Sequence, residues 1–419
     1  SHFGSSLAAP AGLPPPCPFG QRRGAMAASS QPARPLRLGV LGAARAVPTV
    51  IVKPIRRNPD LAAKVEVVAV AARSADKAAA FAAEWGIQKS YGSYAELLAD
   101  PDVDLVYNSL PNALHCEWTV RALMAGKHVL CGKPLSSNAR EAVVMQRAAE
   151  DAGKVCLEAF HAISHPVCKR VRELIVEGKI GTVERVEVNY PVELSQYDAK
   201  IRSKMHQPTP LADDYRMHSE MGGGVTMDLG CYCVAMVKAV TGEDPQVVSA
   251  AAQRWLGDSE VDVAMSCEMH LPSGATAHFD CSFVAGKYAQ PVTMCIAGSN
   301  GKLNVEGFFS AHKANKIRLE QWDDVGVTST ESVDDPGRLN TQDSFYYQLM
   351  AFVDEVGCQD RRPNPGMPWG YTKNKINTPA EGVKNMAILE DVYRAAGMKP
   401  RWTTNPPPAP YDVIGRSRL

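Results

Sequence analysis

The sequence predicts an α/β protein: a doubly wound parallel sheet of the Rossmann type, then a second α/β domain with an open, mostly antiparallel sheet. Three observations predict it. Between residues 36 and 157, short apolar runs alternate with amphipathic helical segments, as in βαβ units. After residue 158, strands are joined by hairpin turns instead. Glycine and polar residues gather at the carboxyl ends of the first strands, where such sheets bind ligands.

Composition narrows the class of protein. A chain of 419 residues with 45% hydrophobic residues is long enough for two domains. Its 45 basic and 45 acidic side chains cancel, which argues against a nucleic-acid partner. We expect no membrane partner, because no apolar run approaches the ~18 residues of a membrane span. Eleven cysteines without a Cys-x-x-Cys pair indicate reduced thiols in a cytoplasmic protein, with a disulfide framework as the less favoured alternative.

The first 35 residues differ from the rest of the chain. They are rich in Ala, Pro, Ser and Gly, and the first acidic residue is Asp60. We expect residues 1–35 to be a disordered leader, with Met26 as an alternative natural start. A basic leader without acidic residues also resembles a transit peptide, so organelle targeting is kept as an alternative to a cytoplasmic location.

A dinucleotide fingerprint is expected after the first strand, residues 36–41. Of its three glycines only Gly42 is present, because alanine and valine occupy the second and third positions. A small residue at the second position still lets backbone N–H groups approach a pyrophosphate at a helix start. The predicted contacts with the cofactor here are Gly42, Ala43, Ala44 and Arg45.

The second strand, residues 65–72, ends in Arg73 and Ser74. At this position an acidic residue would bind the ribose 2′-hydroxyl of NAD, whereas an arginine suits the 2′-phosphate of NADP. The sequence therefore predicts NADP as the cofactor in preference to NAD. The alternative is that Arg73 is a solvated turn residue.

Two further strands end at the same predicted edge. The strand at residues 104–110 stops at Pro111 and Asn112, and the strand at residues 128–131 stops before Lys133 and Pro134. Asn138, followed three residues later by Glu141, predicts a capping box for the next helix. The further cofactor contacts predicted at this edge are Leu110, Pro111, Asn112, His115, Lys133 and Pro134, and His115 is also a candidate for substrate contact.

From residue 158 to residue 398 we expect the second domain. Hairpin signals at residues 272–274 and 299–301 predict two antiparallel strand pairs, and further strands are expected at residues 183–190 and 247–255. Helices are expected at residues 166–177, 345–356 and 381–396. Residues 36–157 form the predicted nucleotide-binding domain, and residues 399–419 an extended tail.

Six segments, taken in this order, resemble the glucose–fructose oxidoreductase/inositol dehydrogenase (Gfo/Idh/MocA) superfamily, most closely its dimeric dihydrodiol dehydrogenase and NADP-dependent D-xylose 1-dehydrogenase branch. They are residues 39–42, 110–115, 128–135, 158–161, 222–232 and 345–352. The resemblance runs from about Leu38 to Met398. It implies hydride transfer between NADP and a small sugar or diol, and a homodimer formed through the second sheet.

The resemblance also implies site residues. The active-site lysine of the family falls on Lys133, and the family's glycine-rich motif ends here in Asp228 and Tyr232. If this segment is helical, the i, i+4 spacing turns both toward one pocket. Tyr232 would be the general acid/base, with a pKa lowered by Lys133, while Asp228 would orient the substrate or balance the lysine. The alternative is a half-buried core tyrosine and a helix-capping aspartate.

One residue departs from the family pattern, because Gly132 stands where the family has glutamate before the lysine. By resemblance, that glutamate would contact the nicotinamide-side ribose. Gly132 therefore raises a second hypothesis, a non-redox or transient-redox enzyme of the lyase type that holds its nicotinamide tightly. A third is a nucleotide-sensing protein without catalysis, against which Lys133 and Tyr232 argue.

Two histidines and an insert complete the candidates. His161 and His165 stand four residues apart near Glu158, but a zinc site needs about three protein ligands, so no metal is predicted. We expect His161 to line the sugar pocket. The insert at residues 197–221 is expected to shape specificity, and its cations also suit an acidic substrate. These cations are Lys200, Arg202, Lys204, His206 and Arg216.

Overall fold

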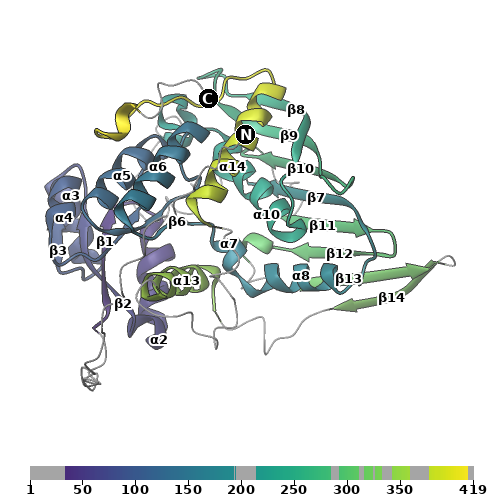
Figure 1. The fold of residues 1–419 in the computed structure, drawn as a ribbon, viewed down its shortest axis with the longest axis horizontal. Helices are drawn as coiled ribbons and strands as arrows, with labels where there is room; N and C mark the ends of the chain where they lie inside the picture. Colours follow the sequence, from purple (N-terminus) through teal and green to yellow (C-terminus); the bar gives the residue numbers. More distant parts are fainter. Residues whose placement is uncertain are drawn as a thin grey trace, which may run out of the picture. The chain divides into compact units, whose positions relative to one another are not determined.

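In a computed structural model of the chain, six parallel strands form the first sheet (Figure 1). Their order, β3-β2-β1-β4-β5-β6, is that of a doubly wound dinucleotide-binding fold, which confirms the predicted fold class. From β1 the sheet is built outward to β3 on one side and then, from β4 to β6, on the other side. The carboxyl ends of β1 and β4 therefore mark the crevice in which such folds bind their ligands. The strands are β1 (Leu36–Leu41), β2 (Val65–Ala71), β3 (Lys89–Tyr91), β4 (Leu105–Asn108), β5 (His128–Cys131) and β6 (Cys156–Glu158).

The structure describes residues 34–192, 194, 214–284, 292–310, 316–323, 326–332, 342–358 and 377–413. The predicted leader up to residue 33, and Lys200, Arg202, Lys204 and His206 of the insert, lie outside this part of the chain. The described residues from Pro35 onward group as one compact unit. All ten cysteines among the described residues are free.

Along the chain, helices alternate with the strands of the first sheet. At the fingerprint, the segment after β1 enters a π-helical turn, η1, before it becomes a regular α-helix. Pro54 has no N–H to donate, so the ladder shifts and the Lys53 N–H reaches back to the Pro48 carbonyl. The elements are η1 (Pro48–Val52), α1 (Lys53–Arg57), α2 (Pro59–Ala62), α3 (Ala75–Glu84), α4 (Tyr94–Ala99), η2 (Asn112–Leu114), α5 (His115–Met124) and α6 (Ala139–Ala152).

The predicted cap of α6 is present in a modified form. The Asn138 side chain accepts a hydrogen bond from the Glu141 N–H at 2.9 Å. The Glu141 carboxylate returns to the N–H of Ser137, also at 2.9 Å, rather than to that of Asn138. Both interactions satisfy N–H groups at the helix start, which is the purpose of a capping box.

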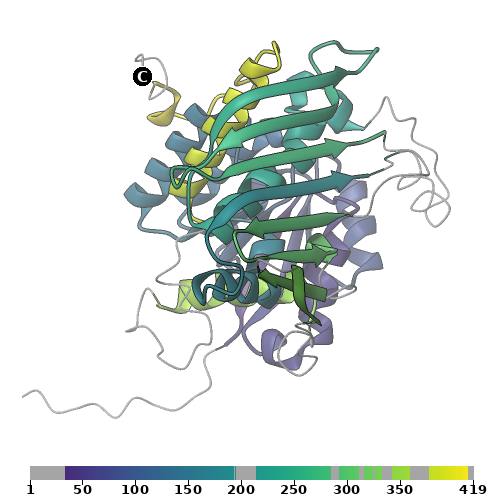
Figure 2. The ribbon, with the colours of Figure 1, turned by 90° about the vertical axis from the view of Figure 1, so that its right-hand side faces the viewer.

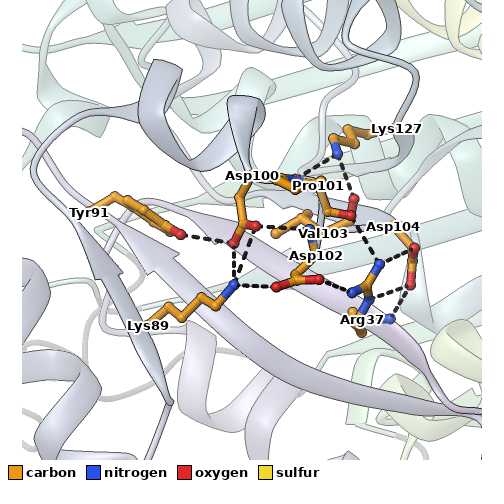
Figure 3. Close-up of polar contacts among 9 residues, drawn as sticks. All are labelled: Arg37, Lys89, Tyr91, Asp100, Pro101, Asp102, Val103, Asp104 and Lys127. Atoms are coloured by element: carbon orange, nitrogen blue, oxygen red, sulfur yellow. Dashed lines mark hydrogen bonds and ion pairs between the residues drawn. The ribbon is translucent and has the colours of Figure 1, made fainter.

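The amino ends of the strands are joined by a network of charges (Figure 3). Lys89 places its ammonium 3.0 Å from Asp100 and 2.8 Å from Asp102, and Arg37 pairs with Asp104 at 3.1 Å. These residues belong to three different strands or the loops before them. Because ligands bind such sheets at the opposite, carboxyl ends, we interpret this network as structural.

The second sheet has eight strands in the order β14-β13-β12-β11-β7-β10-β9-β8. Neighbouring strands are antiparallel except for β7 and β10, so the predicted open and mostly antiparallel sheet is confirmed. Both predicted hairpins are present, β9 with β10 and β11 with β12. The strands are β7 (Val183–Pro191), β8 (Gln246–Arg254), β9 (Asp262–His270), β10 (Thr276–Ser282), β11 (Thr293–Gly298), β12 (Gly301–Glu306), β13 (Lys316–Asp323) and β14 (Gly326–Ser332).

Helices cover one face of the second sheet, and Figure 2 shows its other face without a helix from the described residues. Helix α10 lies on β7 and β10, whereas α14 lies between β8 and α6 of the first half. Helix α13 packs instead on α1, α2 and α7. The elements are α7 (His161–Ser164), α8 (Pro166–Val176), η4 (Tyr215–Met217), η5 (Ser219–Met221), η6 (Thr226–Gly230), α10 (Cys231–Thr241), η7 (Phe308–Ser310), α13 (Ser344–Cys358), α14 (Pro379–Ala395) and η8 (Tyr411–Val413).

The helical segment Ser219–Thr241 is long and apolar enough to cross a membrane by composition alone. Its most apolar window is 89% buried inside the protein, as is usual for a core helix. We therefore assign it to the core, between the second sheet and the first half of the chain.

The C-terminal tail does more than run extended along the surface. Arg401 is fully buried, Thr404 donates to the Glu220 carbonyl, and the Asn405 amide donates to the Ala113 carbonyl at 3.3 Å. The tail therefore joins the first half of the chain to the segment before η6, a role that the sequence does not predict.

Candidate active site

The turn after β1 has the geometry of a nucleotide-binding turn. Gly42 has a φ of 98°, in the left-handed region that favours glycine. A Cβ atom at this residue would lie 2.9 Å from the Ser109 hydroxyl oxygen, and that hydroxyl donates to the Leu41 carbonyl at 2.7 Å. The ends of β1 and β4 are thus drawn together at the crevice, which fits a dinucleotide there. Ala43 and Ala44 are partly exposed and Arg45 is exposed.

Arg73 and Ser74 lie where the sequence placed them, just beyond β2. Arg73 is exposed, and the Ser74 hydroxyl caps α3 by accepting from the Lys77 N–H at 3.3 Å. Burial raises the pKa of Tyr94, and the positive charge of Arg73 opposes this shift. An exposed guanidinium at this strand end fits the 2′-phosphate of NADP.

His115 differs from its predicted role. Its ring is 1% exposed, and its two nitrogens lie 2.8 Å from the carbonyl oxygens of Leu110 and Pro134. Burial lowers the pKa of His115 to about 4, so the ring is neutral near pH 7 and donates to one of the two carbonyls. His115 therefore braces the two loops that follow β4 and β5, which does not fit direct contact with cofactor or substrate.

Asn112 joins the first half of the chain to the glycine-rich segment, since its amide donates to the Gly222 carbonyl at 2.8 Å. Asn112 is 4% exposed, and Leu110 and Pro134 are also buried, while Pro111 is partly exposed. These loop residues lie at the carboxyl ends of the strands, where the cofactor is predicted to bind.

The structure brings Lys133, Asp228 and Tyr232 together. The Lys133 ammonium lies 2.5 Å from Asp228 Oδ1 and 4.8 Å from the centroid of the Tyr232 ring. Lys133 follows β5, whereas Asp228 lies in η6 and Tyr232 in the first turn of α10. The helix is π-helical through Gly230, and the i, i+4 spacing still turns both side chains toward Lys133.

The expectation that Lys133 lowers the pKa of Tyr232 is wrong for this geometry. Burial raises the pKa of Tyr232 well above 10, and the neighbouring Cys231 and Asp228 add to the shift. The ammonium lies over the ring face, where it forms a cation–π contact. Tyr232 is otherwise enclosed by the rings of Phe160, His161, Tyr190 and Phe309.

Arg216 completes this group, and its contact with Asp228 was missed from the sequence. Its Nε lies 3.0 Å from Asp228 Oδ2, so the carboxylate stands between two cations. Burial opposes the ionised form of Asp228, but Lys133 and Arg216 together hold its pKa below the usual range. For Lys133, burial likewise opposes the charge, yet the negative charge of Asp228 leads the interactions that raise its pKa.

His161 is buried beside Tyr232, with ring centroids 5.7 Å apart, and its Nδ1 lies 2.7 Å from the Ser344 hydroxyl. His165 caps α8 by accepting from the Val167 N–H at 3.2 Å. Within the described ranges, no group of three His, Cys, Asp or Glu side chains could hold a metal ion.

Gly132 has a packing reason to be glycine. A Cβ atom there would lie 3.0 Å from two atoms of the His115 ring and 3.1 Å from the Asn108 carbonyl oxygen. The His115 ring is buried and hydrogen-bonded, and the Asn108 carbonyl accepts from the Gly132 N–H at 2.9 Å, so a Cβ atom would require one of them to shift by a few tenths of an ångström. A side chain at this position would therefore crowd the His115 ring.

Comparisons with known proteins find relatives of both halves of the chain. Residues 36–160 match the family described as an oxidoreductase family with an NAD-binding Rossmann fold, and residues 168–304 match the GFO/IDH/MocA C-terminal domain. A D-xylose 1-dehydrogenase (NADP(+)) of Haloferax volcanii is 35% identical over 70% of this chain and 82% of its own. A trans-1,2-dihydrobenzene-1,2-diol dehydrogenase of Xenopus tropicalis is 31% identical over 57% of this chain and 67% of its own.

Solved structures share the fold. An aldose–aldose oxidoreductase from Caulobacter crescentus, complexed with glycerol, superposes with a TM-score of 0.69 at 22% identity. This likeness covers 87% of the present chain and 98% of the other.

Proposed function

The chain belongs to the GFO/IDH/MocA family of oxidoreductases, and we propose that it transfers hydride between NADP and a carbon of a small sugar or diol. The substrates proposed are an aldose, oxidised at C1 to a lactone, or a trans-dihydrodiol. The observation that carries the proposal is the Lys133 ammonium, held between the Asp228 carboxylate and the Tyr232 ring beside the nucleotide crevice.

The residues at the crevice fit NADP. Gly42 and Ala44 would let the pyrophosphate approach the backbone, and Arg73 would hold the 2′-phosphate. When bound, the nicotinamide supplies the acceptor or donor of hydride.

The protein's own residues handle the charge on the substrate oxygen. As an alcohol becomes a carbonyl, its oxygen loses a proton while its carbon loses hydride, and the reverse reaction returns both. Lys133 is protonated, so it can stabilise negative charge on that oxygen. Tyr232 keeps its phenolic proton in the absence of substrate, which makes it a proton donor in the direction of reduction. In oxidation the Tyr232 oxygen would take up the substrate proton as its own phenolic proton leaves to water, so that the step releases one proton in total.

The alternative, a non-redox or transient-redox enzyme of the lyase type, rests on Gly132. A side chain at Gly132 would crowd the nearby His115 ring, so local packing offers a second reason for the glycine beside a change of chemistry.

The test is turnover by the purified protein with NADP and a panel of aldoses and trans-diols, followed through NADPH absorbance, with NAD in parallel. Lys133→Met should lower kcat by a factor of ~10² to 10³. Lys169→Met removes a lysine from the surface of α8 and should leave the rate unchanged. No turnover across the panel, with NADPH still bound, would overturn the proposal.

The cofactor preference has its own test. Arg73→Asp removes the cation and offers a carboxylate to the ribose 2′-hydroxyl, so kcat/KM should shift from NADP toward NAD. An unchanged preference would mean that Arg73 does not read the 2′-phosphate.

We also propose that two copies pair through the open face of the second sheet. That face is built of small and polar side chains, among them Asn189, Ala264 and Ser266, around a shallow hollow. Ala264→Arg should convert a dimer to a monomer in light scattering, whereas Ala80→Arg, an exposed alanine on α3, should not. A monomeric unmodified protein would refute this pairing.

A further inference from the structure

Arg216 stands at the centre of a chain of alternating charges. Its Nε faces Asp228 Oδ2 at 3.0 Å, and its Nη1 contacts both carboxylate oxygens of Asp214, at 3.1 and 3.0 Å. Asp214 in turn lies 3.8 Å from Nη2 of Arg45, and Asp228 pairs with Lys133. The order is Lys133, Asp228, Arg216, Asp214 and Arg45.

The chain of charges connects two parts of the site that are far apart in sequence. Lys133 and Asp228 are the proposed catalytic pair, whereas Arg45 belongs to the turn that follows Gly42 at the nucleotide crevice. Asp214 and Arg216 belong to the segment just before the glycine-rich residues, and their side chains link these two parts of the site. Asp214 and Arg216 are 7% and 24% exposed, so their interaction is only partly screened by solvent.

The two contacts of Arg216 have different consequences. Toward Asp228, the guanidinium occupies Oδ2, so the carboxylate keeps a compensating cation when the Lys133 ammonium turns toward a substrate oxygen. Without Arg216, Asp228 would keep Lys133 as its described ion-pair partner, and moving the ammonium would strand a half-buried carboxylate.

Toward Asp214, Arg216 competes with Arg45. As long as Arg216 holds both oxygens of Asp214, the longer pair with Arg45 is weak, and the 43% exposed Arg45 side chain can turn to a phosphate. If the Arg216 side chain is removed, Asp214 keeps its hydrogen bond from the backbone N–H of residue 216, and its described ion pair is the one with Arg45, so it draws the Arg45 side chain away from the nucleotide.

We propose that Arg216 is a positioning residue that fixes Asp228 for the Lys133 ammonium and, through Asp214, sets the availability of Arg45 for the cofactor phosphates. The proposal rests on the proposed function for its catalytic half, whereas its nucleotide half requires only that NADPH binds.

The nucleotide half is tested by NADPH affinity, measured by fluorescence on the full-length protein. Arg216→Gln should weaken NADPH binding about 3- to 10-fold, and Asp214→Asn should not weaken it. In an Arg45→Gln background, Arg216→Gln should have no further effect, because its influence passes through Arg45. Arg170→Gln, which removes a surface arginine of α8, is the control and should bind NADPH normally.

The catalytic half is tested by steady-state kinetics with the substrate that the panel identifies. Arg216→Gln should lower kcat ~10²-fold with a much smaller change in the substrate KM, because a misplaced catalytic group costs this much. Arg216→Lys should recover only part of the loss, since an ammonium cannot bridge two carboxylates as a guanidinium fork does. A normal kcat in Arg216→Gln would overturn this half, and additive effects of Arg45→Gln and Arg216→Gln on NADPH affinity would overturn the other. A wild-type protein that binds NADPH without turnover refutes the proposed function and with it the catalytic half, whereas the nucleotide half is still decided by the affinity measurements.

Discussion

Replacing Arg401 should destabilise the protein far more than its place in a C-terminal tail suggests. The side chains of Arg401 and Asp262 are both 0% exposed, and Nη2 lies 2.9 Å from Oδ1. Asp262 also accepts from the Tyr393 hydroxyl at 3.0 Å and from the Thr226 N–H at 2.7 Å. Arg401 Nε donates to the Gly223 carbonyl at 2.7 Å. The pair therefore fixes the glycine-rich segment from which Asp228 follows.

The magnitude follows from what each substitution leaves behind. Arg401→Met keeps an apolar side chain of similar length but leaves the Asp262 carboxylate buried with two neutral donors. Breaking a buried pair in this way costs ~3 to 5 kcal/mol. Asp262→Asn added to Arg401→Met removes the stranded charge, so the double variant should be more stable than Arg401→Met alone.

The assay is urea unfolding of the four proteins of this cycle, followed by tryptophan fluorescence, together with kcat of the folded variants. Arg401→Lys should lie between wild type and Arg401→Met, because it keeps the charge and loses the fork. An Arg401→Met protein within ~1 kcal/mol of wild type would refute the argument, since so small a loss is typical of exposed ion pairs. A double variant less stable than Arg401→Met would refute it as well.

Three further predictions concern Glu158, Gly132 and Asp100. Burial raises the pKa of Glu158 to about 8, above the ~4.3 of an unfolded chain, so the free energy of unfolding should fall as pH rises between these values. Glu158→Gln should flatten this part of a urea-midpoint profile, and an unchanged slope would contradict the assignment. Gly132→Ala should cost ~1 to 3 kcal/mol in thermal unfolding because its Cβ meets the His115 ring, and a neutral result would show that the ring can move. At Asp100, burial raises the pKa, but hydrogen bonds from the Asp102 N–H, Lys89 and Tyr91 outweigh it and hold the pKa below the usual range. Asp100→Asn should thus lower the free energy of unfolding at neutral pH, and by less as pH falls through that pKa. An equal loss of stability at pH 3 and pH 7 would refute this prediction.

Local patterns allowed most of the fold to be predicted. Turn residues at positions 272–274 and 299–301 placed two hairpins correctly, and alternation of strands and helices correctly predicted a parallel sheet of the doubly wound type. Strands β13 and β14 were missed because their sequences are largely polar, as strands near a sheet edge often are. The π-helical turn after β1 had a signal, two prolines six residues apart, that a fingerprint search does not use.

The site was predictable only where a motif marks it. Lys133, Asp228 and Tyr232 meet as the resemblance implied. Arg216 and Arg401 carried no comparable signal. Arg401 pairs with a carboxylate 139 residues earlier, and nothing in its flanking tail distinguishes a buried guanidinium from a surface one. Charge compensation is a property of the folded structure, so it does not appear in local spacing.

The glycine-rich segment explains why these missed arginines matter to the residues that were found. A Cβ atom at Gly223 would lie 2.5 Å from the Arg216 carbonyl oxygen, and one at Gly224 would lie 2.1 Å from Asp262 Oδ1. Gly223 thus lets the Arg216 backbone come close, and Gly224 lets the buried Asp262 carboxylate come close. Because η6 begins two residues after Gly224, both contacts fix the position of η6 and therefore the direction in which the Asp228 side chain faces Lys133. The glycines therefore serve this site as packing contacts for two charged pairs, one partly exposed beside Lys133 and one sealed in the core.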